Sequence, residues 1–203
     1  IRDQPRSRGS EMCIRDSSFT GTKIEQAVVT AILNVTTDDK VVVDMIKGNN
    51  EQDYSSLKTL LENNAYQVNE VSLATGDFDS NAKIAIMYAP SVDLDEKIVE
   101  KLSTWLSNDG KYGRSLIYVP TADMGEMPNL DDFLKEWGMS IDRGYVFETD
   151  ESTLVSASSP YAFTVSYGDY YKDNLKNSKI PVVVSESHAV NTVSYTHLRA
   201  HET

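Results

Sequence analysis

The stretch KVVVDMIKGNNE, residues 40–51, joins a β-branched run directly to a polar loop that contains a glycine. A short, almost wholly apolar run is typical of a strand that is buried on both faces of a sheet. We therefore predict a strand at 40–46 and a tight loop at 47–51. A helix is expected from about 52 to 63, because Leu57, Leu60 and Leu61 then share one face.

The same alternation of strand and helix continues along the chain. Further strands are predicted at 66–73, 83–88, 115–119 and 145–147. Two further helices are expected, one capped by Asp93 or Asp95 and ending near 108–110, the other running from Pro128 to Gly138. Strands that alternate with helices of this length indicate βαβ units. The predicted fold class is α/β, a three-layer sandwich with a mostly parallel sheet.

The segments on either side of this pattern are less regular. Residues 22–35 place apolar side chains at three- and four-residue steps, which predicts a lead-in helix with one buried face. Beyond Asp150 the chain is small and polar, with strands expected at 161–167 and 180–184. We interpret 18–150 as the α/β domain and 151–191 as a partial C-terminal extension of the same domain.

Both ends of the chain look foreign to the protein. Residues 12–16, MCIRD, can be encoded by ATGTGTATAAGAGAC, whose reverse complement translates as VSYTH, the sequence of residues 193–197. Inverted copies of one DNA element therefore bracket the reading frame, as in translated transposase adaptors from metagenomic libraries. We treat 1–17 as adaptor-like and disordered and 192–203 as adaptor-like, and expect the rest to be a fragment of a longer bacterial gene.

The composition excludes several classes of protein. Lys and Arg number 19 against 31 Asp and Glu, a net charge of −12, so a phosphate backbone would be repelled and nucleic acid is not an expected partner. No apolar run is long enough for a membrane-spanning helix. The one cysteine, Cys13, lies in the adaptor-like segment, which removes thiolate chemistry from the remainder.

A parallel sheet places its ligand crevice at the carboxyl ends of the strands. The loops there are predicted at 47–51, 89–91 and 120–125, and they supply the candidate ligand-binding residues Gly48, Asn49, Asn50, Glu51, Pro90 and Asp123. Nucleotide binding is disfavoured because no glycine-rich phosphate motif is present, and Glu51 and Asp53 place negative charge at the helix start.

Other reactive groups are sparse. No nucleophile elbow surrounds Ser91, and His188 is expected at the surface or at a sheet edge. Asp77, Asp79 and the acids at 93–96 do not follow a calcium-loop spacing, so we expect no metal, no cofactor and no catalytic residue. Trp105 and Trp137 lie on apolar helix stripes and are predicted to pack in the core.

Several segments together resemble a known family, the auxiliary domain of GldG-like ABC transporter components, which are associated with gliding motility. The resemblance covers roughly residues 19–149. It is carried by TAILNVT at 30–36, by GNNE at 48–51, and by YAP at 88–90 with DLDE at 93–96. Leu102, Trp105, Leu106, Gly110, Asn129, Leu130, Trp137 and Gly138 continue it.

The resemblance implies a fold similar to flavodoxin-like and class I glutamine amidotransferase-like sandwiches. It also implies a domain on the extracytoplasmic face of the cell membrane, tethered by helices outside this fragment and working with ABC permease and ATPase subunits. Family members commonly carry Gly-His-Gly-Glu where this chain has Gly48-Asn49-Asn50-Glu51. The missing histidine disfavours proton transfer there, whereas amide hydrogen bonding to a small polar ligand or carbohydrate stays open.

The preferred hypothesis is a non-enzymatic auxiliary or ligand-sensing domain of an ABC-type transport or gliding-related system. One alternative is a hydrolase or amidotransferase-like enzyme that uses the carboxylates of Glu51 and Asp123, which requires the two to converge in a closed pocket. Another is a carbohydrate- or peptide-binding module built on Tyr161, Tyr167, Tyr170 and Tyr171, which requires exposed, coplanar rings in a groove.

Overall fold

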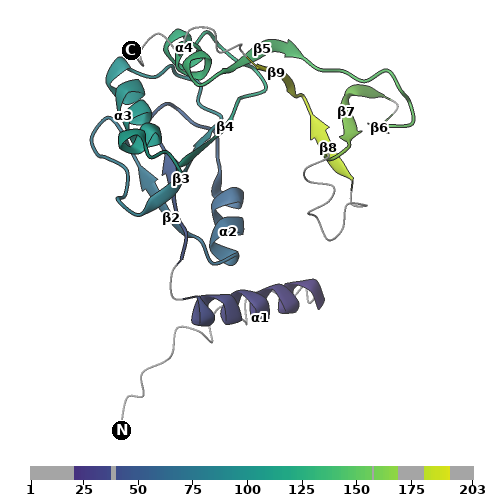
Figure 1. Ribbon diagram of the computed structural model, residues 1–203. Helices are drawn as coiled ribbons and strands as arrows, with labels where there is room; N and C mark the ends of the chain where they lie inside the picture. Colours follow the sequence, from purple (N-terminus) through teal and green to yellow (C-terminus); the bar gives the residue numbers. More distant parts are fainter. Residues whose placement is uncertain (1–20, 38–39, 157, 169–180, 193–203) are drawn as a thin grey trace.

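The computed structural model describes residues 21–37, 40–156, 158–168 and 181–192 (Figure 1). The adaptor-like ends, except for Thr192, and the pair Tyr170 and Tyr171 lie outside the described residues. Four strands form one parallel sheet in the order β2-β1-β3-β4. Their bounds are β1 Val42–Ile46, β2 Gln67–Val71, β3 Ala82–Tyr88 and β4 Ser115–Val119. This confirms the predicted α/β class, and the strand order is that of a flavodoxin-like sandwich.

Helices cover the two faces of this sheet. α2 (Ser55–Asn63) lies on one face, and α3 (Glu96–Ser107) and α4 (Pro128–Glu136) pack together on the other. A short 3-10 turn at Asn108–Gly110 ends α3. We call the part from β1 to α4 the body.

The side chains of β1 alternate between the two cores, and all five of its residues are buried. Val42 and Ile46 join the larger cluster with Leu102, Phe133 and other residues of α3 and α4. Val43 and Met45 join Ile86 in a smaller cluster beneath α2. The strand predicted from KVVVDMI is therefore the centre of the fold.

Beyond α4, the described residues form two further antiparallel sheets. β5 (Met139–Tyr145) pairs with β9 (His188–Thr192), and we call this pair the ribbon. β6 (Leu154–Ser156), β7 (Ser159–Val165) and β8 (Val182–Ser185) form a three-stranded sheet, which we call the small sheet. Figure 1 shows the ribbon reaching from α4 to the small sheet, which stands apart from the body.

The ribbon corrects the prediction for the fifth strand. We predicted a strand at 145–147, but β5 begins at Met139, directly after α4, and ends at Tyr145. Gly138 has φ +81, a left-handed conformation that ends α4 and lets the chain turn at once into the extended state. The new strand then pairs with β9 instead of entering the parallel sheet.

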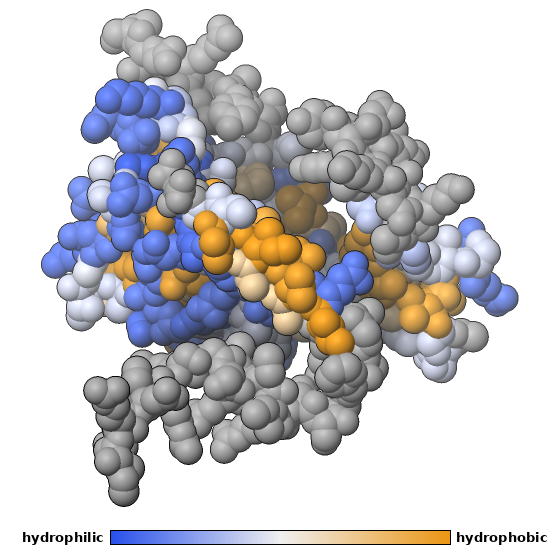
Figure 2. Space-filling view, turned by 90° about the horizontal axis from the view of Figure 1, so that it is seen from below, coloured by the Kyte–Doolittle hydropathy of each residue, from blue (hydrophilic) through white to orange (hydrophobic). Residues whose placement is uncertain are grey.

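The lead-in helix is present, but its apolar face is not buried as predicted. α1 (Gly21–Thr36) contacts α2, and Thr30 Oγ1 donates to Asn63 O at 2.7 Å. Its large apolar side chains stay exposed: Ile24, Val28, Val29, Ile32 and Val35. Figure 2 shows apolar surface across the face of the molecule on which α1 lies. Among the described helices none is long and apolar enough to cross a membrane.

Candidate functional site

Glu51 holds the loop after β1 together. Its carboxylate accepts the backbone N–H groups of Gly48, at 3.0 Å, and of Asn49, at 2.9 Å. The side-chain amide of Asn49 also donates to it at 3.3 Å. Glu51 therefore occupies the place at which the amides of this loop could have bound a ligand anion. The three candidate site residues Gly48, Asn49 and Glu51 are bound to one another.

The loops after β1 and β3 are joined in the same way. Ser91 Oγ donates to Asn50 O at 2.9 Å, and the Asn50 side-chain amide donates back to Ser91 Oγ. Asn49 O accepts the N–H groups of Ser91 and Val92, both at 3.1 Å. Two of the three predicted crevice loops, those after β1 and β3, therefore come together through these hydrogen bonds.

Local backbone geometry explains the glycine in this loop. Gly48 has φ +118, and a Cβ atom there would lie 3.3 Å from Ser72 Oγ, so a side chain would meet both strain and crowding. Asn50 and Ala89 also have positive φ, at 54° and 47°. The sharp turns at the ends of β1 and β3 therefore depend on residues that tolerate the left-handed region.

The candidate residues differ in how accessible they are. Asn49 and Pro90 are buried and support the loops, whereas Glu51 is half-buried. Asn50 and Asp123 are exposed and form the accessible part of this edge. Among the described residues, no hydrogen bond joins Glu51 to Asp123.

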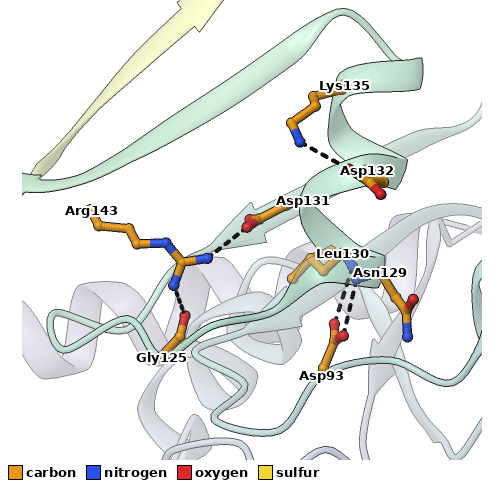
Figure 3. A network of polar contacts seen from close by, with 8 residues as sticks. All are labelled: Asp93, Gly125, Asn129, Leu130, Asp131, Asp132, Lys135 and Arg143. Atoms are coloured by element: carbon orange, nitrogen blue, oxygen red, sulfur yellow. Dashed lines mark hydrogen bonds and ion pairs between the residues drawn. The ribbon is translucent and has the colours of Figure 1, made fainter.

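Asp93 connects two segments that carry the resemblance, DLDE and the Asn129-Leu130 pair. Its two carboxylate oxygens accept the N–H groups of Asn129 and Leu130 at 3.0 and 3.1 Å (Figure 3). Asn129 Nδ2 donates back to Leu94 O at 2.7 Å. We expected Asp93 or Asp95 to cap the helix that follows, but Asp93 caps α4, and Asp95 precedes α3 without a side-chain cap.

A second contact fixes the ribbon on α4. Arg143 of β5 pairs with Asp131 at 2.6 Å and also donates to Gly125 O (Figure 3). Tyr118 of β4 is electrostatically coupled to this pair. Burial and the charge of Asp131 raise the pKa of Tyr118, whereas the charge of Arg143 lowers it. The resulting pKa is about 12. Among the described residues, the buried hydroxyl of Tyr118 has no hydrogen-bond partner.

Sequence reasoning missed a buried carboxylate in the middle of β1. Asp44 is fully buried, and it accepts Asn69 Nδ2 at 3.2 Å and the Asp79 N–H at 2.8 Å. Burial raises the pKa of Asp44 against the effect of these two hydrogen bonds, and the Asp79 charge raises it further. The signal in the sequence was one acid inside an apolar run, but its partners lie 25 and 35 residues away.

The connection from β2 to β3, which has no helix, covers Asp44 and is tied down by α3. Lys101 donates to Leu73 O at 3.0 Å and to Gly76 O at 2.7 Å, and pairs with Asp77 at 2.8 Å. Phe78 stacks on Trp105, with ring centroids 4.5 Å apart. The predicted core position of Trp105 is confirmed, and Trp137 packs against the same core.

A groove of about 480 Å³ lies between this connection and α3. Because Ser80 and Arg114 come directly before β3 and β4, the groove sits at the amino ends of the strands, away from the predicted crevice. Its lining is mixed: it includes the carboxylates of Asp77, Asp79, Glu100 and Asp109, the cations of Lys101 and Arg114, and the rings of Phe78 and Trp105. Within the described ranges, no three His, Cys, Asp or Glu side chains gather in a way that could hold a metal ion.

His188 and its aromatic neighbours lie where the ribbon meets the body. His188 opens β9, an edge position as predicted, and its ring stacks on Tyr145. Tyr145 meets Tyr161 edge to face at 67°, so these exposed rings do not form a coplanar platform.

No family model matches the sequence, and no curated protein matches it. The structure itself defines an α/β sandwich in which the loops after β1 and β3 are bound to each other. The GldG-like resemblance stays a prediction.

Proposed function

We propose that this chain is a non-catalytic auxiliary or ligand-sensing domain of a GldG-like, ABC-type transport or gliding-related system. It acts on the extracytoplasmic face of the membrane, with permease and ATPase subunits as partners. The observation that best supports a non-catalytic role is the state of Glu51, whose carboxylate is occupied by the amides of Gly48 and Asn49. A carboxylate that anchors its own loop is poorly placed to act on a substrate.

The contacts between motif segments give further support. Asn50 binds Ser91, and Asp93 binds the start of α4, so the residues that carry the resemblance meet in space. Such contacts build a rigid edge, while Asn50 and Asp123 stay exposed for a small polar ligand or a partner subunit.

The proposal is tested by deleting residues 41–148 from the gene within its intact operon. We expect the permease and ATPase to be recovered in a smaller complex, with transport reduced. Unchanged assembly and unchanged transport would reject the proposal.

A finer test reverses one exposed charge at the carboxyl edge, Asp123→Lys. The matched control is Lys83→Glu at the amino end of β3, which is also exposed. We expect Asp123→Lys to weaken co-purification with the permease or binding of a small polar ligand, and Lys83→Glu to leave both intact. Equal effects of the two variants would count against this edge as the contact surface.

The enzymatic alternative makes a different prediction. A hydrolase or amidotransferase-like enzyme would need Glu51 and Asp123 to act on one substrate. Turnover of an amide or ester substrate by the whole chain, abolished by Glu51→Gln without loss of folding, would replace our proposal with that alternative.

A further inference from the structure

His188 bridges the body and the ribbon through both of its ring nitrogens. Nε2 lies 3.1 Å from Thr121 O in the loop after β4, and Nδ1 lies 3.3 Å from Gly144 O in β5. These two acceptors are 67 and 44 residues away in the chain. One imidazole therefore contacts both the body and the neighbouring strand of its own ribbon.

A neutral imidazole cannot satisfy both carbonyls. It carries one N–H and one lone pair, so one tautomer binds Thr121 and turns its lone pair toward Gly144 O, and the other tautomer does the reverse. The imidazolium carries two N–H groups and donates to both oxygens. Hydrogen bonds from a charged donor are also stronger than those from a neutral one.

The aromatic contact favours the same charged form. The His188 ring stacks on Tyr145, with centroids 5.3 Å apart and planes 26° apart. A tyrosine ring face attracts a cation. The ring of Tyr145 also meets the ring of Tyr161 in β7 edge to face, with centroids 6.0 Å apart. The row of aromatic rings therefore continues from the ribbon into the small sheet.

The charged side chains of the surrounding elements leave His188 without a carboxylate partner. Arg143 of β5 is bound to Asp131 and Gly125. Glu186 precedes β9, and its N–H donates to Tyr161 O at 3.0 Å. Asp123 follows Thr121 and is exposed. In the part of the chain that the structure describes, no ion pair joins His188 to any of these three or to Asp142, the exposed acid of β5, so backbone carbonyls and an aromatic ring receive its charge.

The geometry points to a proton-operated clasp: protonated His188 fastens the ribbon to the body through Thr121 O, and neutral His188 gives up one of its two carbonyl contacts. Histidine is the residue type that most often serves as a pH switch in proteins. Since the ribbon carries the small sheet, the clasp contributes, together with the Arg143–Asp131 pair, to the attachment of that sheet to the body.

The test is hydrogen exchange of the whole chain at pH 5.5 and pH 8.0, corrected for the intrinsic effect of pH. The amide of Val146, which donates to Ser187 O at 2.8 Å, reports on the junction directly. We expect protection of the ribbon amides to be about five-fold greater at pH 5.5, the difference between a charged and a neutral hydrogen bond. His188→Gln should abolish this step, and the control His197→Gln should keep it.

A pH-dependent change in amide protection that persists in His188→Gln would overturn the proposal. The absence of such a change from the wild-type chain would also overturn it. If His188→Gln does not fold, the ring protons of the wild-type chain decide the matter. Two hydrogen-bonded ring N–H groups should both exchange slowly with water at pH 5.5 in NMR spectra. Exchange of both at the rate of a free imidazolium would overturn the proposal.

Discussion

The body and the small sheet differ in how much of their apolar side chains they bury. In the body, two helix layers enclose the sheet, and side chains such as Val43, Leu102 and Phe133 are at most 2% exposed. In the small sheet, Phe163 alone of the described large apolar side chains is buried, while Val155 and Val183 are each 54% exposed. Three short strands without a covering layer cannot bury both of their faces. The stability of this molecule therefore resides in the body.

The largest expected effect compares one truncation in each region. Phe133→Ala removes a ring from the centre of the α3 and α4 core, and we expect it to lower the free energy of unfolding by about 3–5 kcal/mol. Phe163→Ala removes the same ring from the small sheet, where Leu154 and Val184 are half-buried neighbours, and should cost clearly less.

Urea unfolding followed by tryptophan fluorescence measures how much each variant lowers the stability of the body, because Trp105 lies in its core and Trp137 packs against that core. Equal losses would break the comparison and would show that the small sheet unfolds together with the body as one unit.

An intermediate effect is expected where the body joins two distant segments. Asp93→Ala removes the cap from the N-terminus of α4 and should cost about 1–2 kcal/mol. Asp95→Ala is the matched control, because Asp95 precedes α3 without a side-chain cap bond. Thermal unfolding of the two variants should separate them, and a similar loss in both would contradict a structural role for Asp93.

The smallest effect concerns the one buried carboxylate of the body. The pKa of Asp44 is raised in the folded chain, so the unfolded chain releases its proton first as the pH increases. The stability that Asp44 contributes is therefore greatest below pH 3.8 and falls as the pH rises to its folded pKa. Asp44→Asn cannot titrate, and we expect it to flatten the dependence of urea stability on pH between 4 and 7.

Glu148→Gln serves as a control with the opposite sign. The N–H groups of Asp150 and Thr149 lower the pKa of Glu148, so its contribution is lost as the pH falls through the acid range. If the free energy of unfolding depended on pH in the same way in Asp44→Asn as in the wild-type chain, the raised pKa of Asp44 would be contradicted.

The sequence predicted the body well because its signals are local. The run KVVVDMI marked β1, the prediction for β4 at 115–119 is confirmed to the residue, and the stripe through Ile98, Leu102 and Trp105 marked the inner face of α3. Hydrophobic periodicity shows which residues share a face, but it does not show whether another element lies against that face. This is why the helix α1 was predicted correctly and its burial was not.

The details of the candidate site depend on contacts between distant residues. Glu51 and its loop amides are neighbours in sequence, yet the two-way contact of Asn50 with Ser91 spans 41 residues. Asp93 caps a helix that starts 35 residues later, and local capping rules consider only the helix that follows. Strand register, which one sequence does not reveal, placed Asn69 beside Asp44.

The Glu51 carboxylate has a consequence for selectivity. The Glu51 carboxylate already accepts the N–H groups of Gly48 and Asn49, so an anion could bind these amides only by displacing it. Because Glu51 belongs to the same loop, its effective concentration at the amides is far above that of a free solute. Phosphate, sulfate and carboxylate compounds are thus competed away by the chain itself. Neutral or cationic molecules encounter no such competitor at this edge, which narrows the search for what the domain recognises.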